Sequence, residues 1–213
     1  MTQIIELDGA LGEGGGQILR TSLSLSLITG RPFRLRNIRA GRPRPGLRPQ
    51  HLTSVQAAAA IGQATVRGAC VDSIDITFEP GKVVPGKYHF PIGTAGATSL
   101  VLHTIYLPLA LAGGGPSELT LEGGTHVSTS PCFDFLKTTW LPYTELCGLH
   151  IDLRLHRRGF YPRGGGLIQA TIQPCPRLHG LQLTERSPLR TASCISAVAS
   201  LPDHIAKRQA ERA

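Results

Sequence analysis

A carboxylate, a run of glycines, an amide and a guanidinium follow one another closely near the start of the chain. The segment is DGALGEGGGQILR, residues 8–20, and it carries Glu13, the glycines 14–16, Gln17 and Arg20. Glycine has no Cβ, so backbone N–H groups in such a loop can come close to a ligand. The apolar run that follows predicts a helix, whose first turn favours an anion through its free N–H groups and its dipole. The segment therefore indicates a site for a phosphate or a carboxylate.

Two well-known phosphate loops do not fit this segment. The dinucleotide fingerprint needs a glycine where Gln17 stands, and the Walker loop needs a Gly-Lys-Ser/Thr ending that the segment lacks. A tight turn that only needs glycine is the alternative. If the helix begins near Glu13, then Glu13, Gln17 and Arg20 are spaced i, i+4 and i+7 and share one face. That shared face favours the ligand site.

A second basic segment, RAGRPRPGLRPQHL at residues 39–52, interleaves arginines with prolines and glycines. Its arginines are Arg39, Arg42, Arg44 and Arg48. Proline fixes φ, so the loop holds its guanidiniums in a partly fixed arrangement. Pro49 suits the first position of a helix, which puts Gln50 and His51 in the first turn, where the dipole disfavours a protonated imidazole. We expect a phosphate site here, with a solvated basic loop as the alternative.

A third segment, LHRRGFYPRGGGLI at residues 155–168, combines arginines, two aromatic residues and three glycines. A hairpin with a glycine-rich turn is one interpretation. The aromatic rings could stack on a base, but aromatic residues make up only 5% of the chain, which argues against a broad stacking surface. The chain has no His-Glu-x-x-His, Cys-x-x-Cys or EF-hand spacing, so a permanent structural metal is not indicated.

The charge balance favours a polyanionic partner. The formal net charge is +8 and the pI is about 9.7. Between Glu13 and Asp72 there are nine arginines, no lysine and no acid. A guanidinium presents a planar fork that can grip two phosphate oxygens, whereas lysine is a point charge.

The cysteines and the apolar segments bear on compartment and membrane association. The five cysteines are widely spaced and odd in number, which is typical of free thiols in a reducing compartment. No secretory signal pattern is present at the N-terminus, so we expect a cytoplasmic protein. The apolar stretch at residues 94–115 contains His103, hydroxyl groups and Pro108, and therefore predicts a buried helix and not a membrane span.

Hydrophobic periodicity predicts alternating strands and helices. The predicted strands are 3–7, 33–38, 73–79, 87–91, 117–122, 149–156 and 167–173, and the predicted helices are about 15–29, 50–61, 95–112 and 131–147. Residues 12–38 and 93–124 both run from a glycine turn through an apolar helix and a glycine stop to a strand. The expected fold class is therefore α/β, built as layered pseudo-repeats with helices on one face of each sheet.

The last part of the chain predicts one strand and one helix, without the further strands that would complete a domain. Residues 190–201, RTASCISAVASL, predict a buried strand, and Asp203 is expected to cap a helix that runs to Ala213. A helix of about ten residues needs a neighbour to be stable. We therefore expect that the chain is cut short, with a terminal helix docked on the main body as the alternative.

Taken together, the three segments resemble the RNA 3′-terminal phosphate cyclase family. DGALGEGGGQILR, IRAGRPRPGLRPQHL and RGFYPRGGG occur in the family's order and at its usual separations, and LTERSPL matches the junction before its inserted domain. The resemblance implies an ATP-dependent ligase of RNA processing that converts an RNA 3′-phosphate to a 2′,3′-cyclic phosphate. In the family a histidine is adenylylated by ATP, the AMP passes to the 3′-phosphate, and the neighbouring 2′-hydroxyl displaces it.

The resemblance also implies roles for individual residues. It implies that the active site is lined by Glu13, Arg20, Arg39, Arg42, Gln50 and His51. ATP would be contacted by His103, Gly14 and Gly15, and Mg²⁺ or Mn²⁺ by Glu13 together with phosphate oxygens. The family tends to have glutamine at the position of His103, and an acid or amide near His126 and Val127.

The implied fold consists of repeated units of two helices and a four-stranded sheet, shared with enolpyruvyl transferases. Residues 1–183 would form the first two repeats of the main domain, and 184–213 the beginning of a small inserted α/β domain. None of the eight histidines stands in the context of the family's nucleophile, so we expect little or no cyclisation by the isolated chain. The expected partners are RNA with a 3′-phosphate and ATP, with no membrane and no DNA-specific binding.

Two other functions fit parts of the same pattern. One is a non-catalytic RNA-binding relative that acts in ribosome assembly. Against it stands the set Glu13, Arg20, Arg42 and His51, which binding alone does not obviously need. The other is an enolpyruvyl-transferase-like enzyme for small anions, which fits the fold and the arginines.

Overall fold

The computed structural model describes residues 3–186, 188 and 190–213. The chain divides into two compact units, Met1–Gly180 and Leu181–Ala213, which are described separately. Ser187 and Leu189, which belong to the predicted LTERSPL junction, lie outside the described residues.

The first unit begins with a four-stranded sheet and two helices. The elements are β1 (Ile5–Asp8), α1 (Gln17–Thr29), β2 (Phe33–Arg36), α2 (Pro49–Gly62), β3 (Thr65–Arg67) and β4 (Ile76–Glu79). The strand order is β1-β2-β4-β3. β1 and β2 are parallel and joined through α1, whereas β4 runs antiparallel to both of its neighbours.

The same unit continues with a second sheet of the same design. Its elements are β5 (Lys87–Pro91), α3 (Thr98–Leu111), β6 (Ser117–Gly123), α4 (Phe133–Phe135), η1 (Leu136–Trp140), α5 (Leu141–Leu146), β7 (Ile151–Arg157) and β8 (Gly166–Ile172). The order β5-β6-β8-β7 repeats the first sheet strand for strand, again with one parallel and two antiparallel pairs. The expectation of repeated two-helix, four-stranded units is confirmed.

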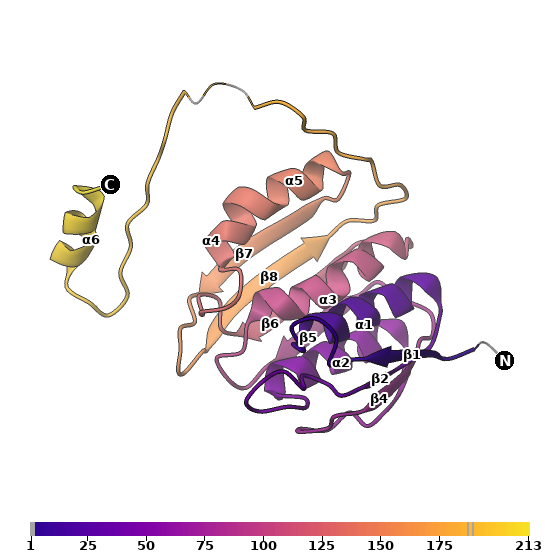
Figure 1. Ribbon diagram of the computed structural model, residues 1–213. Helices are drawn as coiled ribbons and strands as arrows, with labels where there is room; N and C mark the ends of the chain where they lie inside the picture. The colour runs from indigo at the N-terminus through magenta and orange to yellow at the C-terminus, as the bar shows by residue number, and fades with distance from the viewer. Residues whose placement is uncertain (1–2, 187, 189) are drawn as a thin grey trace. The chain divides into compact units, whose positions relative to one another are not determined.

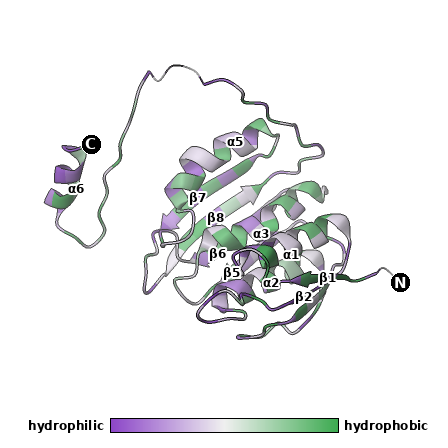
Figure 2. Cartoon of the chain, in the orientation of Figure 1, coloured by the Kyte–Doolittle hydropathy of each residue, from purple (hydrophilic) through white to green (hydrophobic). Residues whose placement is uncertain are grey.

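The core lies between the sheets and the helices. α1, α2 and α3 pack against one another in the middle of the unit (Figure 1). Alternate residues of β6 and β8 are buried, as expected for strands with one face on a core and one face in solvent. In the first sheet Phe33 and Phe78 are fully covered, and their rings stack with centroids 5.7 Å apart. In Figure 2 the strands of the second sheet and much of the helical surface carry hydrophobic residues, while the connecting loops are more hydrophilic.

Helix ends follow the signals in the sequence. Gly30 ends α1 in the left-handed conformation, with φ 68°, and its N–H donates to the carbonyl of Ser26. Pro49 is the first residue of α2, as predicted. The helix predicted over 131–147 is confirmed but contains a π-helical turn, η1. Pro142, two residues after this turn, has no N–H to donate to the carbonyl of Thr138 within the turn.

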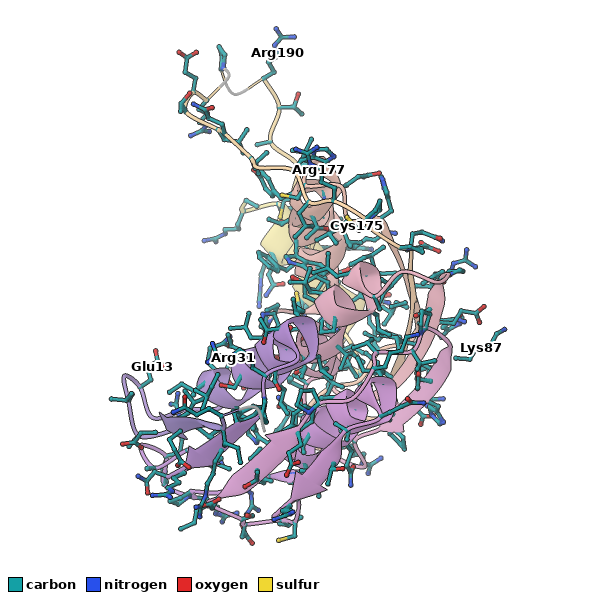
Figure 3. The ribbon with its side chains drawn as sticks, turned by 90° about the vertical axis from the view of Figure 1, so that its right-hand side faces the viewer. Glu13, Arg31, Lys87, Cys175, Arg177 and Arg190 are labelled. Atoms are coloured by element: carbon teal, nitrogen blue, oxygen red, sulfur yellow. The ribbon has the colours of Figure 1, made fainter. Side chains whose placement is uncertain are left out.

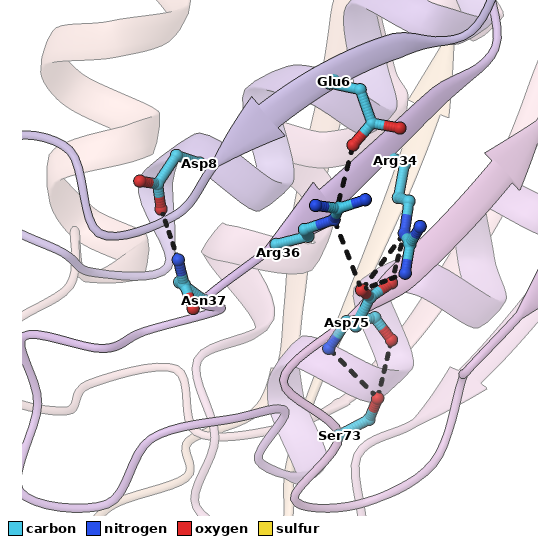
Figure 4. Close-up of polar contacts among 7 residues, drawn as sticks. All are labelled: Glu6, Asp8, Arg34, Arg36, Asn37, Ser73 and Asp75. Carbon is cyan, nitrogen blue, oxygen red and sulfur yellow. Dashed lines mark hydrogen bonds and ion pairs between the residues drawn. The ribbon is translucent and has the colours of Figure 1, made fainter.

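The outer face of the first sheet carries a network of ion pairs (Figure 4). Arg34 grips the carboxylate of Asp75 with two nitrogens, the closest contact being 2.8 Å, and Arg36 lies 3.4 Å from Glu6. Asp8 accepts hydrogen bonds from the backbone N–H of Ala10 at 2.9 Å and from the amide of Asn37 at 3.0 Å, and these bonds lower the pKa of its carboxyl. We call residues 9–16 the glycine loop and residues 37–48 the arginine-proline loop. The hydrogen bond between Asp8 and Asn37 therefore fixes the points at which these two loops leave the sheet.

The second unit contains one helix, α6 (Asp203–Ala210), which has no buried residue and is mostly hydrophilic in Figure 2. Asp203 is its first helical residue and not a side-chain cap, because the N-cap position is occupied by Pro202. The buried strand predicted over 190–201 is wrong: these residues form no strand, and Ile195 is 89% exposed. A strand needs a partner for its N–H and C=O groups, and none of the described strands pairs with this segment.

In the described part of the chain, no helix is long and apolar enough to cross a membrane. The apolar stretch that contains His103 forms α3, a helix of 14 residues within the first unit. All five cysteines are free thiols.

Candidate phosphate site

The glycine loop and the arginine-proline loop are held together through their backbones. The N–H of Gly41 donates to the carbonyl of Gly14 at 3.1 Å, and the N–H of Gly9 donates to that of Arg36 at 2.7 Å. Gly14 has φ 53°, and a Cβ there would lie 2.6 Å from the nitrogen of Gly41. Both the conformation and the close approach exclude a side chain at this position. The first glycine thus lets two distant segments meet.

The next two glycines leave room for charged and polar side chains. A Cβ on Gly15 would lie 2.8 Å from Nη2 of Arg42. A Cβ on Gly16 would lie 2.9 Å from Nη1 of Arg20 and 2.8 Å from Cδ2 of His51. Three side chains from α1, α2 and the connecting loop therefore converge on one short stretch of backbone.

Glu13 lies in the loop before α1. The prediction that it shares a helical face with Gln17 and Arg20 is wrong, because α1 begins only at Gln17. Its side chain is 88% exposed, projects from the loop (Figure 3), and forms an ion pair of 3.0 Å with Arg42. Glu13 still lines a cavity of about 650 Å³ together with Gln17, Arg20 and Arg42. The loop, and not helical spacing, brings the four together.

Arg20 is the most deeply buried charge of this site. It is 7% exposed, donates from Nη2 to Oε1 of Gln17 at 3.0 Å, and has no described hydrogen-bond partner at Nε. Burial lowers the pKa of its guanidinium to about 10. The described residues place no carboxylate in an ion pair with it. A buried cation without a counter-ion is expensive unless an anion binds beside it.

His51 occupies the first turn of α2 and is mostly buried. Its pKa is lowered to about 3, first by burial and then by the positive charges of Arg39, Arg20 and Arg48. The sequence predicts that the protonated imidazole is disfavoured by the helix dipole. In the structure, burial is the main cause. Nδ1 is buried and has no hydrogen-bond partner among the described residues. His51 is therefore a neutral imidazole with an unused polar atom.

The pKa of His51 gives a testable pH dependence of stability. Because the pKa of about 3 in the folded chain lies below the ordinary 6.5, the unfolded chain binds more protons between these values, and stability falls as the pH drops through this window. For His51→Gln we expect this contribution to disappear, so that the wild-type chain loses about 1–2 kcal/mol more than the variant between pH 7.5 and pH 5. Urea unfolding at both pH values measures the difference. Equal losses in the two proteins would contradict the assignment.

Arg39 stiffens the second loop. It has φ 57°, and its Nη1 donates to the carbonyls of Arg44 at 2.7 Å and Gly46 at 2.9 Å. Its pKa is lowered by burial and by the charges of Arg42 and Arg48. Arg48 is paired with Asp72, whereas Arg44 is exposed and forms no ion pair with any described residue. The loop is therefore ordered by its own guanidiniums.

Gln50 connects the first repeat to the second. Its Oε1 accepts a hydrogen bond of 3.4 Å from the N–H of Ala97, at the start of α3. A Cβ on Gly96 would lie 2.9 Å from the Cβ of Gln50, so the two segments are in close contact. Nε2 of Gln50 is buried without a described partner.

A second cavity, of about 370 Å³, adjoins the first. The two share Gln17, Arg20 and Thr129. The remaining walls of the second cavity are mostly apolar and come from α3 and the segment 131–140: Ser99, Leu100, Leu102, His103, Pro131, Phe135, Leu136 and Trp140. The pKa of His103 is lowered by burial and by Arg20, and its Nδ1 has no described partner. A polar pocket for an anion thus opens beside an apolar pocket.

The structure brings most of the predicted site residues together. Glu13, Gly15, Arg20 and Arg42 line the first cavity, His51 touches the same backbone, and His103 lines the second cavity. Arg39, Gln50 and Gly14 lie in the supporting layer and make hydrogen bonds or backbone contacts there. Sequence reasoning missed Thr129, which lines both cavities from a loop that carries no recognisable motif.

The same residues define what the site can bind. Guanidiniums, a neutral imidazole and glycine N–H groups are suited to a phosphate dianion. In the described part of the chain, no group of three or more His, Cys, Asp or Glu side chains could hold a metal ion. Among the described residues that line the two cavities, Glu13 is the only carboxylate, so it could contribute to a metal site only with ligands from a bound phosphate.

Comparisons with known proteins identify the family of this chain. A family profile described as RNA 3′-terminal phosphate cyclase matches residues 11–211. A protein named RNA 3′-terminal phosphate cyclase from Ralstonia nicotianae is 51% identical over 208 residues, which cover 97% of this chain and 60% of that protein. Proteins of the same name from Koribacter versatilis and Caldivirga maquilingensis are each 49% identical over 210 residues, covering 99% of this chain and 59% of theirs. The chain thus spans about 60% of the length of these relatives.

Proposed function

This chain belongs to the RNA 3′-terminal phosphate cyclase family, and from that premise we propose that it binds the 3′-phosphorylated end of an RNA for ATP-dependent conversion to a 2′,3′-cyclic phosphate. The observation that carries the proposal is the meeting of Arg20, Arg42 and His51 on the backbone of Gly15 and Gly16. Free thiols in all five cysteines support a cytoplasmic place for this reaction.

The terminal phosphate is assigned to the larger cavity. Arg42 reaches it from the exposed side and Arg20 from the buried side. Nε of Arg20 and Nδ1 of His51 have no hydrogen-bond partner among the residues that the structure describes, and they are the kind of buried polar atoms that a bound phosphate would satisfy. A dianion here would also raise the pKa of both groups, because it would offset the positive potential that now lowers the pKa of His51.

The nucleotide is assigned to the smaller cavity. Its apolar walls fit a base, and His103 and Arg20 supply polar groups near the junction with the larger cavity. The N–H of Gly15 and the carboxylate of Glu13 would face the phosphates, the carboxylate through Mg²⁺ or Mn²⁺. The N–H of Gly14 already donates to the carbonyl of Leu11 at 3.2 Å, so Gly14 would contribute by letting the backbone come close to the nucleotide. ATP would supply the activating adenylyl group, and hence a good leaving group at the RNA phosphate.

The chain's own residues orient the ring closure. The 2′-oxygen must bond to phosphorus as the bond to the leaving group breaks, so the terminal ribose has to be held with its 2′-hydroxyl beside the phosphate. Arg20 and Arg42 stabilise the charge that builds up on the phosphate oxygens. His51 is neutral, so if its Nδ1–H donates to the phosphate, its Nε2 can accept the proton that the 2′-hydroxyl loses as the new bond forms. A DNA end lacks the 2′-hydroxyl and could bind without being cyclised.

The test is a binding measurement, because the resemblance matches the family's nucleophilic histidine to none of the chain's eight histidines. We expect the 213-residue chain to bind a fluorescent RNA with a 3′-phosphate at least about tenfold more tightly than the same RNA with a 3′-hydroxyl, since a hydrogen bond to a charged group contributes about 1.5–3 kcal/mol. Arg42→Ala should remove most of this preference.

Arg44→Ala is the matched control, because Arg44 lies two residues away, is exposed and forms no described ion pair. It should leave the preference intact. Equal affinity for the two RNA ends in the wild-type chain would overturn the proposal. Competition by phosphoenolpyruvate, with no competition by phosphorylated RNA, would point instead to a small-anion enzyme.

A further inference from the structure

The loop between β7 and β8 is a basic surface that the proposed site does not use. We call residues 158–165 the β7–β8 arginine loop. The sequence has no acid from residue 153 to residue 184, while this interval contains five arginines: Arg154, Arg157, Arg158, Arg163 and Arg177. Arg158 and Arg163 are exposed and form no ion pair with any residue that the structure describes. Their charges are therefore available to an outside partner.

The loop is held in one shape by its glycines. The N–H of Gly159 donates to Oγ1 of Thr125 at 2.9 Å, and its carbonyl accepts from the N–H groups of Thr125 at 2.9 Å and His126 at 3.0 Å. At the other end, the N–H of Gly164 donates to the carbonyl of Phe160 at 2.7 Å, and a Cβ on Gly164 would lie 2.6 Å from the carbonyl oxygen of Thr94. The arginines thus extend from a preorganised base.

Two contacts place the loop next to the candidate phosphate site. The ring centroids of Phe160 and His126 are 5.3 Å apart, and His126 lies in the β6–α4 connection, which also carries Thr129 and Pro131 of the cavity walls. Gly164 packs on the turn at Thr94, and that turn leads to Ala97, which donates to Gln50. The β7–β8 turn and the β6–α4 connection also lie at the same end of the unit in Figure 1.

The loop combines charge with exposed aromatic surface. Tyr161 is 80% exposed and Phe160 is 39% exposed, between Arg158 and Arg163 in the sequence. Arginines that track a backbone and rings on which bases stack are the two elements of single-stranded nucleic acid recognition. An acidic protein surface would satisfy the charges, but it would give the ring of Tyr161 no base on which to stack.

We propose that the β7–β8 arginine loop binds the single-stranded RNA segment on the 5′ side of the terminal phosphate. Arg158 and Arg163 contact backbone phosphates, and Tyr161 stacks on a base. This inference rests on the proposed function, because it takes the strand to enter the cavities by its 3′ end.

The experiment measures the affinity of the 213-residue chain for 3′-phosphorylated oligonucleotides of two, four, eight and twelve nucleotides. The wild-type affinity should rise with length until the strand covers the loop. Arg158→Ala/Arg163→Ala should bind the dinucleotide as the wild type does, but should bind the twelve-mer about tenfold more weakly, and its salt slope should be smaller by about 1.4 for two lost phosphate contacts. Tyr161→Ala should weaken twelve-mer binding by about tenfold at any salt concentration.

The matched control is Arg31→Ala/Arg67→Ala, which removes the same formal charge from exposed positions outside the loop: Arg31 follows α1, and Arg67 lies in β3, 3.9 Å from Glu79. It should behave as the wild type at every length. If both double variants weaken the twelve-mer equally, the effect is one of net charge and the inference is wrong. The inference is also wrong if the affinity of Arg158→Ala/Arg163→Ala rises with oligonucleotide length as much as that of the wild type does.

A parallel series with 3′-hydroxyl ends separates this inference from the proposed function. If the wild-type chain binds both kinds of end equally, and Arg158→Ala/Arg163→Ala still removes the rise of affinity with oligonucleotide length, the proposed function is wrong and the loop is supported as a strand-binding surface. If the wild-type chain prefers the 3′-phosphate but its affinity does not rise with oligonucleotide length, only the inference about the loop is wrong.

Discussion

Arg20→Met is expected to abolish selective binding of the 3′-phosphate, with a loss of at least about 100-fold, and at the same time to make the protein more stable. Arg20 is 7% exposed, its Nε has no hydrogen-bond partner in the described part of the chain, and burial lowers its pKa to about 10. Burying this cation without a counter-ion opposes folding, and an apolar side chain of similar length removes that cost. We expect a gain of about 1–3 kcal/mol in the free energy of unfolding.

Both halves of this prediction follow from one cause, so both must be measured on the same protein. Urea unfolding gives the stability, and fluorescence anisotropy with 3′-phosphate and 3′-hydroxyl RNA gives the binding. Arg31→Met is the control, since Arg31 is an exposed arginine just after α1, and neither quantity should change. A variant that is less stable than the wild type would show that Arg20 serves the fold, and would contradict its assignment as a ligand-binding charge.

Gly16→Ala is expected to cause the second large loss, again at least about 100-fold in binding of the 3′-phosphate. The added methyl group would lie 2.9 Å from Nη1 of Arg20 and would collide with the imidazole of His51, so both side chains must move. The backbone itself accepts alanine, because Gly16 has φ −82° and ψ −4°. Movement of two ligand-binding groups, and not loss of the fold, should therefore account for the effect.

Gly30→Ala provides the opposite case. Gly30 has φ 68°, and the position that a Cβ would take there has no neighbouring atom within 4 Å, so alanine strains the backbone without touching the site. We expect about 1 kcal/mol of destabilisation and unchanged affinity. Thermal unfolding should show a loss of stability mainly in Gly30→Ala, whereas RNA binding should be lost only in Gly16→Ala. Normal binding by Gly16→Ala would mean that Arg20 and His51 do not act from the positions found here.

The sequence was sufficient to predict the repeated fold because its signals are local. Gly30 and Pro49 mark helix ends through backbone geometry, and the alternation in β6 and β8 reflects one buried face. The predicted strand at 190–201 failed because pairing is not local: an apolar segment becomes a strand only when another strand meets it.

The candidate site shows the same limit. Segment order and residue type point to Glu13, Arg20, Arg42 and His51, but the helical face that Glu13, Gln17 and Arg20 would share if the helix began near Glu13 does not form, because Glu13 lies in the loop. The low pKa of His51 was attributed to the helix dipole, whereas burial among guanidiniums is the larger cause. Burial depends on which distant segments pack together, and a single sequence does not state it. The catalytic and nucleotide-binding roles remain predictions.

The central claim is that glycine amides and arginines from separate segments bind one phosphate group. Titration of the ¹⁵N-labelled chain with a 3′-phosphorylated tetranucleotide tests it most directly. We predict that the amide signals of Gly15 and Gly16 and the Nε signals of Arg20 and Arg42 shift together, with one dissociation constant, and that the 3′-hydroxyl tetranucleotide leaves them nearly unchanged. Shifts confined to residues outside the two cavities, or equal shifts with both oligonucleotides, would contradict it.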